Sequence, residues 1–99
     1  MLRIALEVPM ITLDHTILHV RDLERSIHFY HEVLGFKHEG RLDPFEIIRV
    51  HEGLTIDLVE SDPKDRIHYA FSMGRTAFNE IYARLKRLHV SFGNGPHVS

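Results

Sequence analysis

The same short pattern occurs twice in this chain of 99 residues. A histidine stands in an alternating run of apolar and polar residues, and a helical pattern follows. The first run covers residues 12–20 and contains His15, and the second covers residues 67–73 and contains His68. Alternation with a period of two predicts a strand, whereas apolar spacings of three and four predict a helix. Such an internal repeat predicts two similar units whose histidines are brought together in one site.

The first copy of the pattern is the longer one. Asp22 is a suitable N-cap for the helix that follows the strand, and Gly35 supplies the C-terminal stop of that helix. Three shorter extended segments come next, at residues 36–42, 45–51 and 54–60. Residues 12–62 are therefore predicted to form a βαβββ module.

The second copy is shorter. Residues 61–65 are predicted to be a connector, and the strand at 67–73 leads through a turn at Gly74 into a helix that reaches Leu88. Residues 66–99 are thus predicted to be a partial second module, without the three strands that the first copy contains. The predicted fold class is α+β, with helices on one face of a mixed sheet, in a single domain over residues 1–99.

Charge and composition exclude several classes of partner. The formal net charge of −2 offers no footprint for nucleic acid, and Arg84, Lys86 and Arg87 are interpreted as the solvated face of a helix. No apolar run approaches the roughly 20 residues that span a bilayer, and residues 1–10 make a poor signal peptide. Cysteine is absent, which favours a cytoplasmic location and leaves imidazole and carboxylate groups as the possible metal ligands.

A βαβββ module covers one face of its sheet with the helix and leaves the other face bare. We expect such a bare face to seek a second module, so that the paired faces form a cleft for a small molecule, most simply in a homodimer. The predicted strands place these residues on the bare face: His15, Ile17, His19, Thr55, Asp57 and Val59.

Three residues of that cleft are candidates for chemistry, namely His15, Asp57 and His68. A carboxylate in the middle of an apolar strand is costly to bury unless it is paired or bound to a cation. Two imidazoles and a carboxylate suit Zn²⁺, Fe²⁺, Mn²⁺ or Ni²⁺ and leave positions open for substrate. The same residue types also fit a simpler interpretation, and fit it better when taken alone, in which both histidines are half-buried and hydrogen-bonded to neighbours.

Other histidines offer competing arrangements. His19 lies four residues along the strand from His15, which at about 3.3 Å per residue is roughly 13 Å and too far for one ion, so it is expected to line the cleft. His28, His31 and Glu32 stand three or four residues apart and could form a separate site on one helix face.

The run from Leu13 to Tyr30, followed by Val33-Leu34-Gly35-Phe36, resembles the opening of the vicinal oxygen chelate superfamily. That superfamily contains glyoxalase I, extradiol dioxygenases, fosfomycin-inactivating thiol transferases and bleomycin-resistance proteins. Residues 67–71, with the helix to Leu88, resemble the start of its second module. The resemblance implies paired βαβββ modules around a divalent metal.

The resemblance also assigns residues. It implies that His15 and His68 are metal ligands. Asp57 falls where glyoxalases place a carboxylate ligand, usually glutamate, whereas thiol transferases and dioxygenases do not use this position. Asp57 is therefore expected either to bind the metal or to act as an acid or base in the cleft.

The last ligand of the superfamily, a glutamate on its final strand, has no counterpart before Ser99, and neither has its closing Asp-Pro-Asp-Gly turn. We therefore expect either a C-terminally incomplete form that holds metal poorly or two chains that share a site. Three functions stay open. They are a metal-dependent lyase, dioxygenase or thiol transferase acting on vicinal oxygens, a metal-free drug-binding or resistance protein, and an inactive module.

Overall fold

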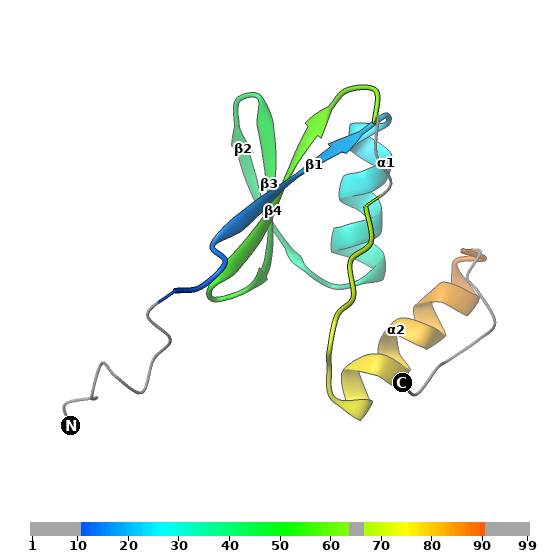
Figure 1. The fold of residues 1–99 in the computed structure, drawn as a ribbon. Coiled ribbons are helices and arrows are strands. Elements are labelled where there is room, and N and C mark those ends of the chain that lie inside the picture. Colours follow the sequence, from blue (N-terminus) through cyan, green and yellow to red (C-terminus); the bar gives the residue numbers. More distant parts are fainter. Residues whose placement is uncertain (1–10, 64–66, 91–99) are drawn as a thin grey trace.

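The computed structural model describes residues 11–63 and 67–90 of the chain, and they contain four strands and two α-helices (Figure 1). In chain order the elements are β1 (His15–Val20), α1 (Leu23–His28), the π-helical turn η2 (Phe29–Val33), β2 (Lys37–Leu42), β3 (Phe45–His51), β4 (Leu54–Glu60) and α2 (Arg75–Arg87). Among these residues, neither helix has the length and apolar character that crossing a membrane requires.

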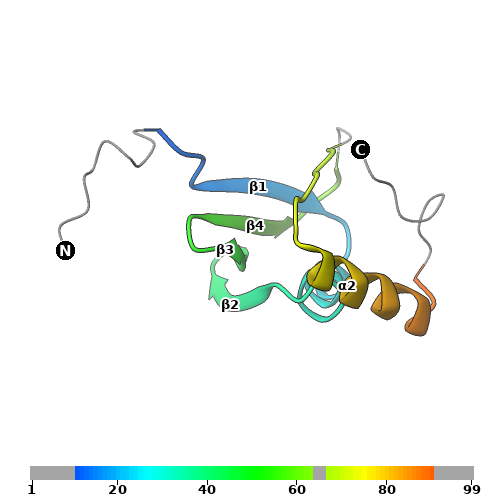
Figure 2. The same ribbon diagram turned by 90° about the horizontal axis from the view of Figure 1, so that it is seen from below.

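The four strands form one mixed sheet in the order β1-β4-β3-β2. β1 pairs with β4 in parallel, whereas β3 is antiparallel to both β4 and β2. The helix α1 lies against the sheet, and α2 lies beyond it, next to η2 (Figures 1 and 2). This arrangement confirms the predicted α+β fold class and all four strands of the first module.

Local sequence signals account for the bounds of the first helix. Asp22 has an extended backbone, and its Oδ1 accepts a hydrogen bond of 3.0 Å from the backbone N–H of Arg25. The helix passes into the wider π-turn η2, where the N–H of Leu34 bonds to the carbonyl of Phe29 at 3.1 Å. Gly35, at φ +79°, then ends the helical segment. Both the N-cap and the glycine stop were predicted from the sequence.

The core lies between the sheet and α1. Ile48 on β3 and Ile56 and Leu58 on β4 are fully buried. Strand residues alternate between the two faces, so the even-numbered positions of β1, Thr16, Leu18 and Val20, face this core. The odd-numbered positions of β1 are left on the opposite, bare face.

Residues 67–73 do not form the strand that their alternation predicts. A strand needs backbone partners, and no strand of the described residues pairs with this segment. The aromatic side chains of the segment instead pack against the core, where the Tyr69 hydroxyl lies 3.1 Å from Thr16 Oγ1 and the Phe71 ring contacts Phe36 edge-on. In Figure 1 the segment runs alongside α1.

The helix predicted after residue 74 is confirmed as α2, but one of its basic residues is not solvated as expected. Arg84 is only partly exposed, and its Nη1 donates a hydrogen bond of 2.9 Å to the carbonyl of Val33. A carbonyl at the end of a helical segment lacks a helical partner, so a cation is favourable there. Arg84 therefore fastens α2 to η2.

Candidate metal-binding face

The bare face of the sheet brings two of the three predicted site residues together. His15 on β1 pairs with Thr55 on β4, and Ile17 pairs with Asp57. Since residues two apart on a strand share a face, His15 and Asp57 are diagonal neighbours on the same face of adjacent strands. Diagonal neighbours lie within reach of long side chains.

The carboxylate of Asp57 is held by a neighbour on its own strand. Thr55 is almost fully buried, and its Oγ1 donates a hydrogen bond of 2.8 Å to Asp57 Oδ1. Among the residues that the structure describes, none donates a hydrogen bond to Asp57 Oδ2. One carboxylate oxygen is thus fixed in place and the other is left to bind a cation or a proton.

The imidazole of His15 has a carboxylate partner on one nitrogen. Its Nδ1 lies 3.0 Å from Asp14 Oδ2, and because an ionised carboxylate only accepts, the ring N–H donates from Nδ1. This hydrogen bond raises the pKa of His15, and the charge of Asp57 adds to the increase. The neutral ring then carries its lone pair on Nε2, as in metal-ligating histidines whose second nitrogen bonds a carboxylate.

An ion pair borders this site on the same face. Arg49 on β3 donates from Nε and Nη2 to Glu39 on β2, at 3.1 and 3.2 Å, and this hydrogen bonding lowers the pKa of Glu39. The remaining Nη1 of Arg49 donates to the carbonyls of His51 and Glu52. The guanidinium of Arg49 therefore forms hydrogen bonds within the chain, and it is not a free binding group on this face.

The third predicted residue, His68, does not form a three-residue cluster with the other two in the described part of the chain. His68 is exposed and has no regular secondary structure. The next residue, Tyr69, packs against the core. In residues 11–63 and 67–90, no group of three or more histidine, aspartate or glutamate side chains is placed to hold a metal ion. One chain therefore brings together two candidate ligands, and the role of His68 stays a prediction.

The competing helical site is not formed in the described part of the chain. The Nδ1 of His31 donates to the carbonyl of Phe36 at 2.7 Å, so this nitrogen is taken. Its Nε2 lies 3.7 Å from Glu32 Oε1. The π-turn also separates His31 from His28 on α1, and the three residues make no metal cluster.

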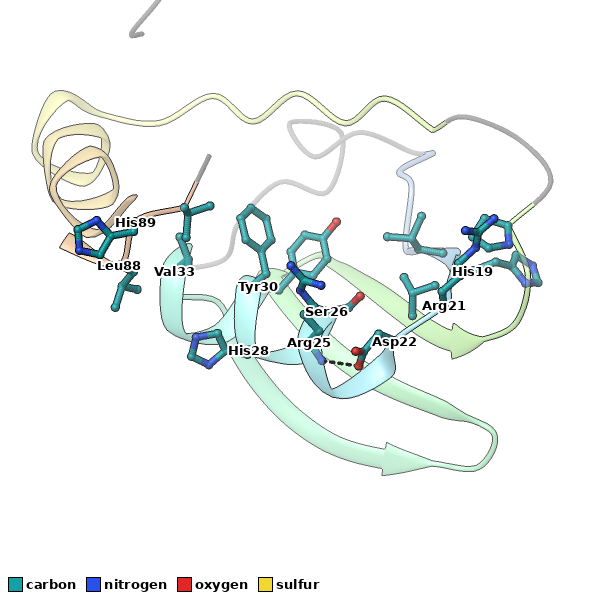
Figure 3. A pocket seen from close by; sticks show the side chains of 15 residues that line it. His19, Arg21, Asp22, Arg25, Ser26, His28, Tyr30, Val33, Leu88 and His89 are labelled. Carbon is teal, nitrogen blue, oxygen red and sulfur yellow. Dashed lines mark hydrogen bonds between the residues drawn. The ribbon is translucent and has the colours of Figure 1, made fainter. Parts of the chain in front are cut away.

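An open hollow of about 940 Å³ lies elsewhere, between the end of β1, the α1–η2 segment and the end of α2 (Figure 3). Arg25 and Tyr30 line one side of it, and Leu88 and His89 line another. Neither His15 nor Asp57 belongs to it, so the hollow is distinct from the bare face. No pattern in the sequence indicated this hollow, because its walls meet only through long-range packing.

A buried carboxylate on the helix-covered face was also missed by sequence reasoning. Glu46 on β3 accepts from His38 at 2.7 Å and from Arg41 at 2.9 Å, and Arg41 also bonds Asp43 at 2.8 Å. Burial raises the pKa of Glu46, but the hydrogen bonds from His38 and Arg41 outweigh it, and the net pKa is lowered. Both partners come from the neighbouring strand of the β2–β3 hairpin, which suggests a structural role.

The fold agrees with comparisons to known proteins. The chain belongs to the Glyoxalase/Bleomycin resistance protein/Dioxygenase superfamily, whose family model matches residues 12–98. This membership confirms the resemblance that the opening residues indicated.

Solved structures with the same fold include two proteins described as oxidases. Oxidase ChaP-H2 is 26% identical with a TM-score of 0.75, and the match covers 82% of this chain and 65% of that one. Oxidase ChaP-H1 is 30% identical with a TM-score of 0.71, over 79% of this chain and 64% of that one. A hypothetical protein from S. aureus is 25% identical with a TM-score of 0.61, over 93% and 80%. The chain thus matches less than two thirds of the length of either oxidase.

Proposed function

We propose that this chain binds a divalent metal ion on its bare sheet face and acts on a small substrate with two vicinal oxygens. The observation that carries the proposal is the diagonal pair of His15 and Asp57, in which His15 Nε2 and Asp57 Oδ2 are both available. Membership of the superfamily supports the same assignment. His68 is proposed as a further ligand, to be brought in by the pairing of modules.

The donor set fits a divalent ion of the first transition row. One imidazole and one carboxylate suit Fe²⁺, Mn²⁺, Zn²⁺ or Ni²⁺, and the hydrogen bonds from Thr55 and to Asp14 orient both groups. When bound, such an ion supplies Lewis acidity toward a pair of substrate oxygens. If Asp57 does not bind the metal, the same position allows it to accept or donate a proton beside the substrate.

Two further features refine the proposal. The structural neighbours described as oxidases favour a redox reaction over isomerisation or thiol addition. The absence of cysteine from the sequence favours a cytoplasmic location.

The test is the metal content of protein prepared without a histidine tag and reconstituted separately with each candidate ion. The wild type is compared with His15→Ala and Asp57→Asn, and His28→Ala, an exposed helical histidine, serves as the matched control. We expect both site variants to lose most of the bound metal and the control to keep it. Metal content that is negligible, or that is unchanged in both site variants, would overturn the proposal and leave a metal-free binding protein as the better candidate.

A further inference from the structure

The open hollow between the end of β1, the α1–η2 segment and the end of α2 lies outside the proposed metal site. Its volume of about 940 Å³ is near the upper end of the roughly 300–1,000 Å³ that is typical of small-molecule sites. Figure 3 shows Val33 and Leu88 at one end of the hollow and Arg21 and Asp22 at the other, with Arg25 between them. An apolar end and a polar end suit a ligand that is itself amphipathic.

The guanidinium of Arg25 is a cation without an internal partner in the wall of this hollow. Its backbone N–H bonds to Asp22 Oδ1, but no group in residues 11–63 and 67–90 bonds to its side chain. Arg21, in contrast, pairs with Asp62 at 3.3 Å. Arg25 is therefore available to bind a carboxylate through two parallel N–H groups.

The hydroxyl of Tyr30 is a second available polar group. The ring of Tyr30 packs against Phe29 and Phe36, and burial raises the pKa of Tyr30, so the phenol is neutral and can donate a hydrogen bond. No described residue bonds to this hydroxyl. Since no buried side-chain oxygen of the described residues lacks a partner, the hydroxyl is accessible from the hollow.

The charges around the hollow limit the ligand to a single negative charge. Two arginines and one aspartate line it, and Arg21 is already paired with Asp62. Arg25 therefore attracts an anion, whereas the carboxylate of Asp22 at the same end opposes a second negative charge. A carboxylate meets this condition better than a phosphate, which carries nearly two charges at neutral pH.

We propose that the hollow binds a small amphipathic carboxylic acid. Its carboxylate accepts hydrogen bonds from Arg25 and Tyr30, and its apolar part lies against Phe29 and Leu88. Leu88 is 42% exposed, so a ligand that covers it removes apolar surface from water. This site needs no metal ion and does not depend on the proposed function.

The test uses the untagged chain in EDTA, so that no divalent metal contributes to binding. The probes are 1-naphthaleneacetate, its neutral amide 1-naphthaleneacetamide and 1-naphthyl phosphate. Titration into ¹⁵N-labelled protein should shift the amide signals of Arg25, Tyr30 and Leu88 and leave those of His15 and Asp57 in place. We expect the carboxylate to bind about tenfold more tightly than the amide, and more tightly than the phosphate.

Variants separate the two ends of the site. Arg25→Gln should lower the affinity for 1-naphthaleneacetate about tenfold, and Tyr30→Phe should lower it as well. Arg87→Gln, at an exposed position outside the hollow, is the matched control. Leu88→Ser should weaken binding of the carboxylate and the amide alike, whereas Leu42→Ser, exposed on β2, should weaken neither. Far-UV circular dichroism checks that each variant is folded.

Several results would overturn the inference. They are no binding of 1-naphthaleneacetate at millimolar concentration, equal affinity for the carboxylate and the amide, unchanged affinity in Arg25→Gln, or signal shifts centred on the bare face. Tighter binding of 1-naphthyl phosphate would contradict the limit to a single charge. Because the titrations contain no free divalent metal, none of these results bears on the proposed metal site.

Discussion

Thr55 and Asp57 point to the same face of β4, and Thr55 Oγ1 donates a hydrogen bond of 2.8 Å to Asp57 Oδ1. Replacing Thr55 with valine keeps the shape of the side chain but removes the donor. Outer partners of metal ligands typically contribute about 10- to 100-fold to affinity. We therefore expect Thr55→Val to weaken divalent metal binding by about 10-fold or more.

Thr55→Ser is the matched control, because it restores the hydroxyl. Isothermal titration with the ion that the wild type binds best should show near-normal affinity for the serine variant. Equal affinities for the valine variant and the wild type would show that Asp57 needs no such support.

The buried carboxylate of Glu46 predicts a loss of stability in acid. Hydrogen bonds from His38 and Arg41 lower its folded pKa below the ordinary value of 4.5. A lowered carboxyl pKa contributes stability above the unfolded pKa, and this contribution disappears as the pH falls through the folded pKa. Urea unfolding between pH 6 and pH 3 should therefore show a falling free energy of unfolding.

Glu46→Gln should be less stable than the wild type at pH 6, and the difference should shrink toward pH 3. Glu52→Gln, at an exposed turn, should follow the wild-type profile. A difference between Glu46→Gln and the wild type that does not change with pH would contradict this account.

The contact of Arg84 with the carbonyl of Val33 predicts how α2 is attached. A hydrogen bond involving a charged group is worth about 1.5–3 kcal/mol, and this one spans 2.9 Å. Arg84→Met keeps the apolar stem and removes the donor, so the amides of α2 should exchange faster with solvent. Arg87→Met, at an exposed position of the same helix, should change the exchange little. Unchanged protection in Arg84→Met would show that apolar packing alone holds α2.

The elements that sequence reasoning predicted correctly depend on local chemistry. The Asp22 cap and the positive φ of Gly35 are properties of a few neighbouring residues. The alternation of β1 correctly placed His15 on the bare face because the period of a strand is set by its own backbone.

The elements that were missed depend on partners far along the chain. Residues 67–73 alternate as a strand does, but alternation cannot provide the neighbouring strand that backbone hydrogen bonds require. The partial burial of Arg84 depends on where α2 packs, and the Glu46 cluster depends on the register of the β2–β3 hairpin. The same distinction holds for the candidate site. The diagonal placement of His15 and Asp57 follows from the register of β1 and β4. Bringing His68 to them requires a pairing of modules that the alternating pattern alone does not supply.

The most direct test of the account is the location of the bound ion in the untagged protein. Mn²⁺ is added below one equivalent to ¹⁵N-labelled protein, and paramagnetic broadening of the amide signals is recorded. We expect the signals of His15 and Asp57 and their strand neighbours to broaden first, and the signals of His28 and His31 to stay sharp. Broadening centred on the helical histidines, or spread evenly over the acidic surface, would contradict a metal site on the bare face of the sheet.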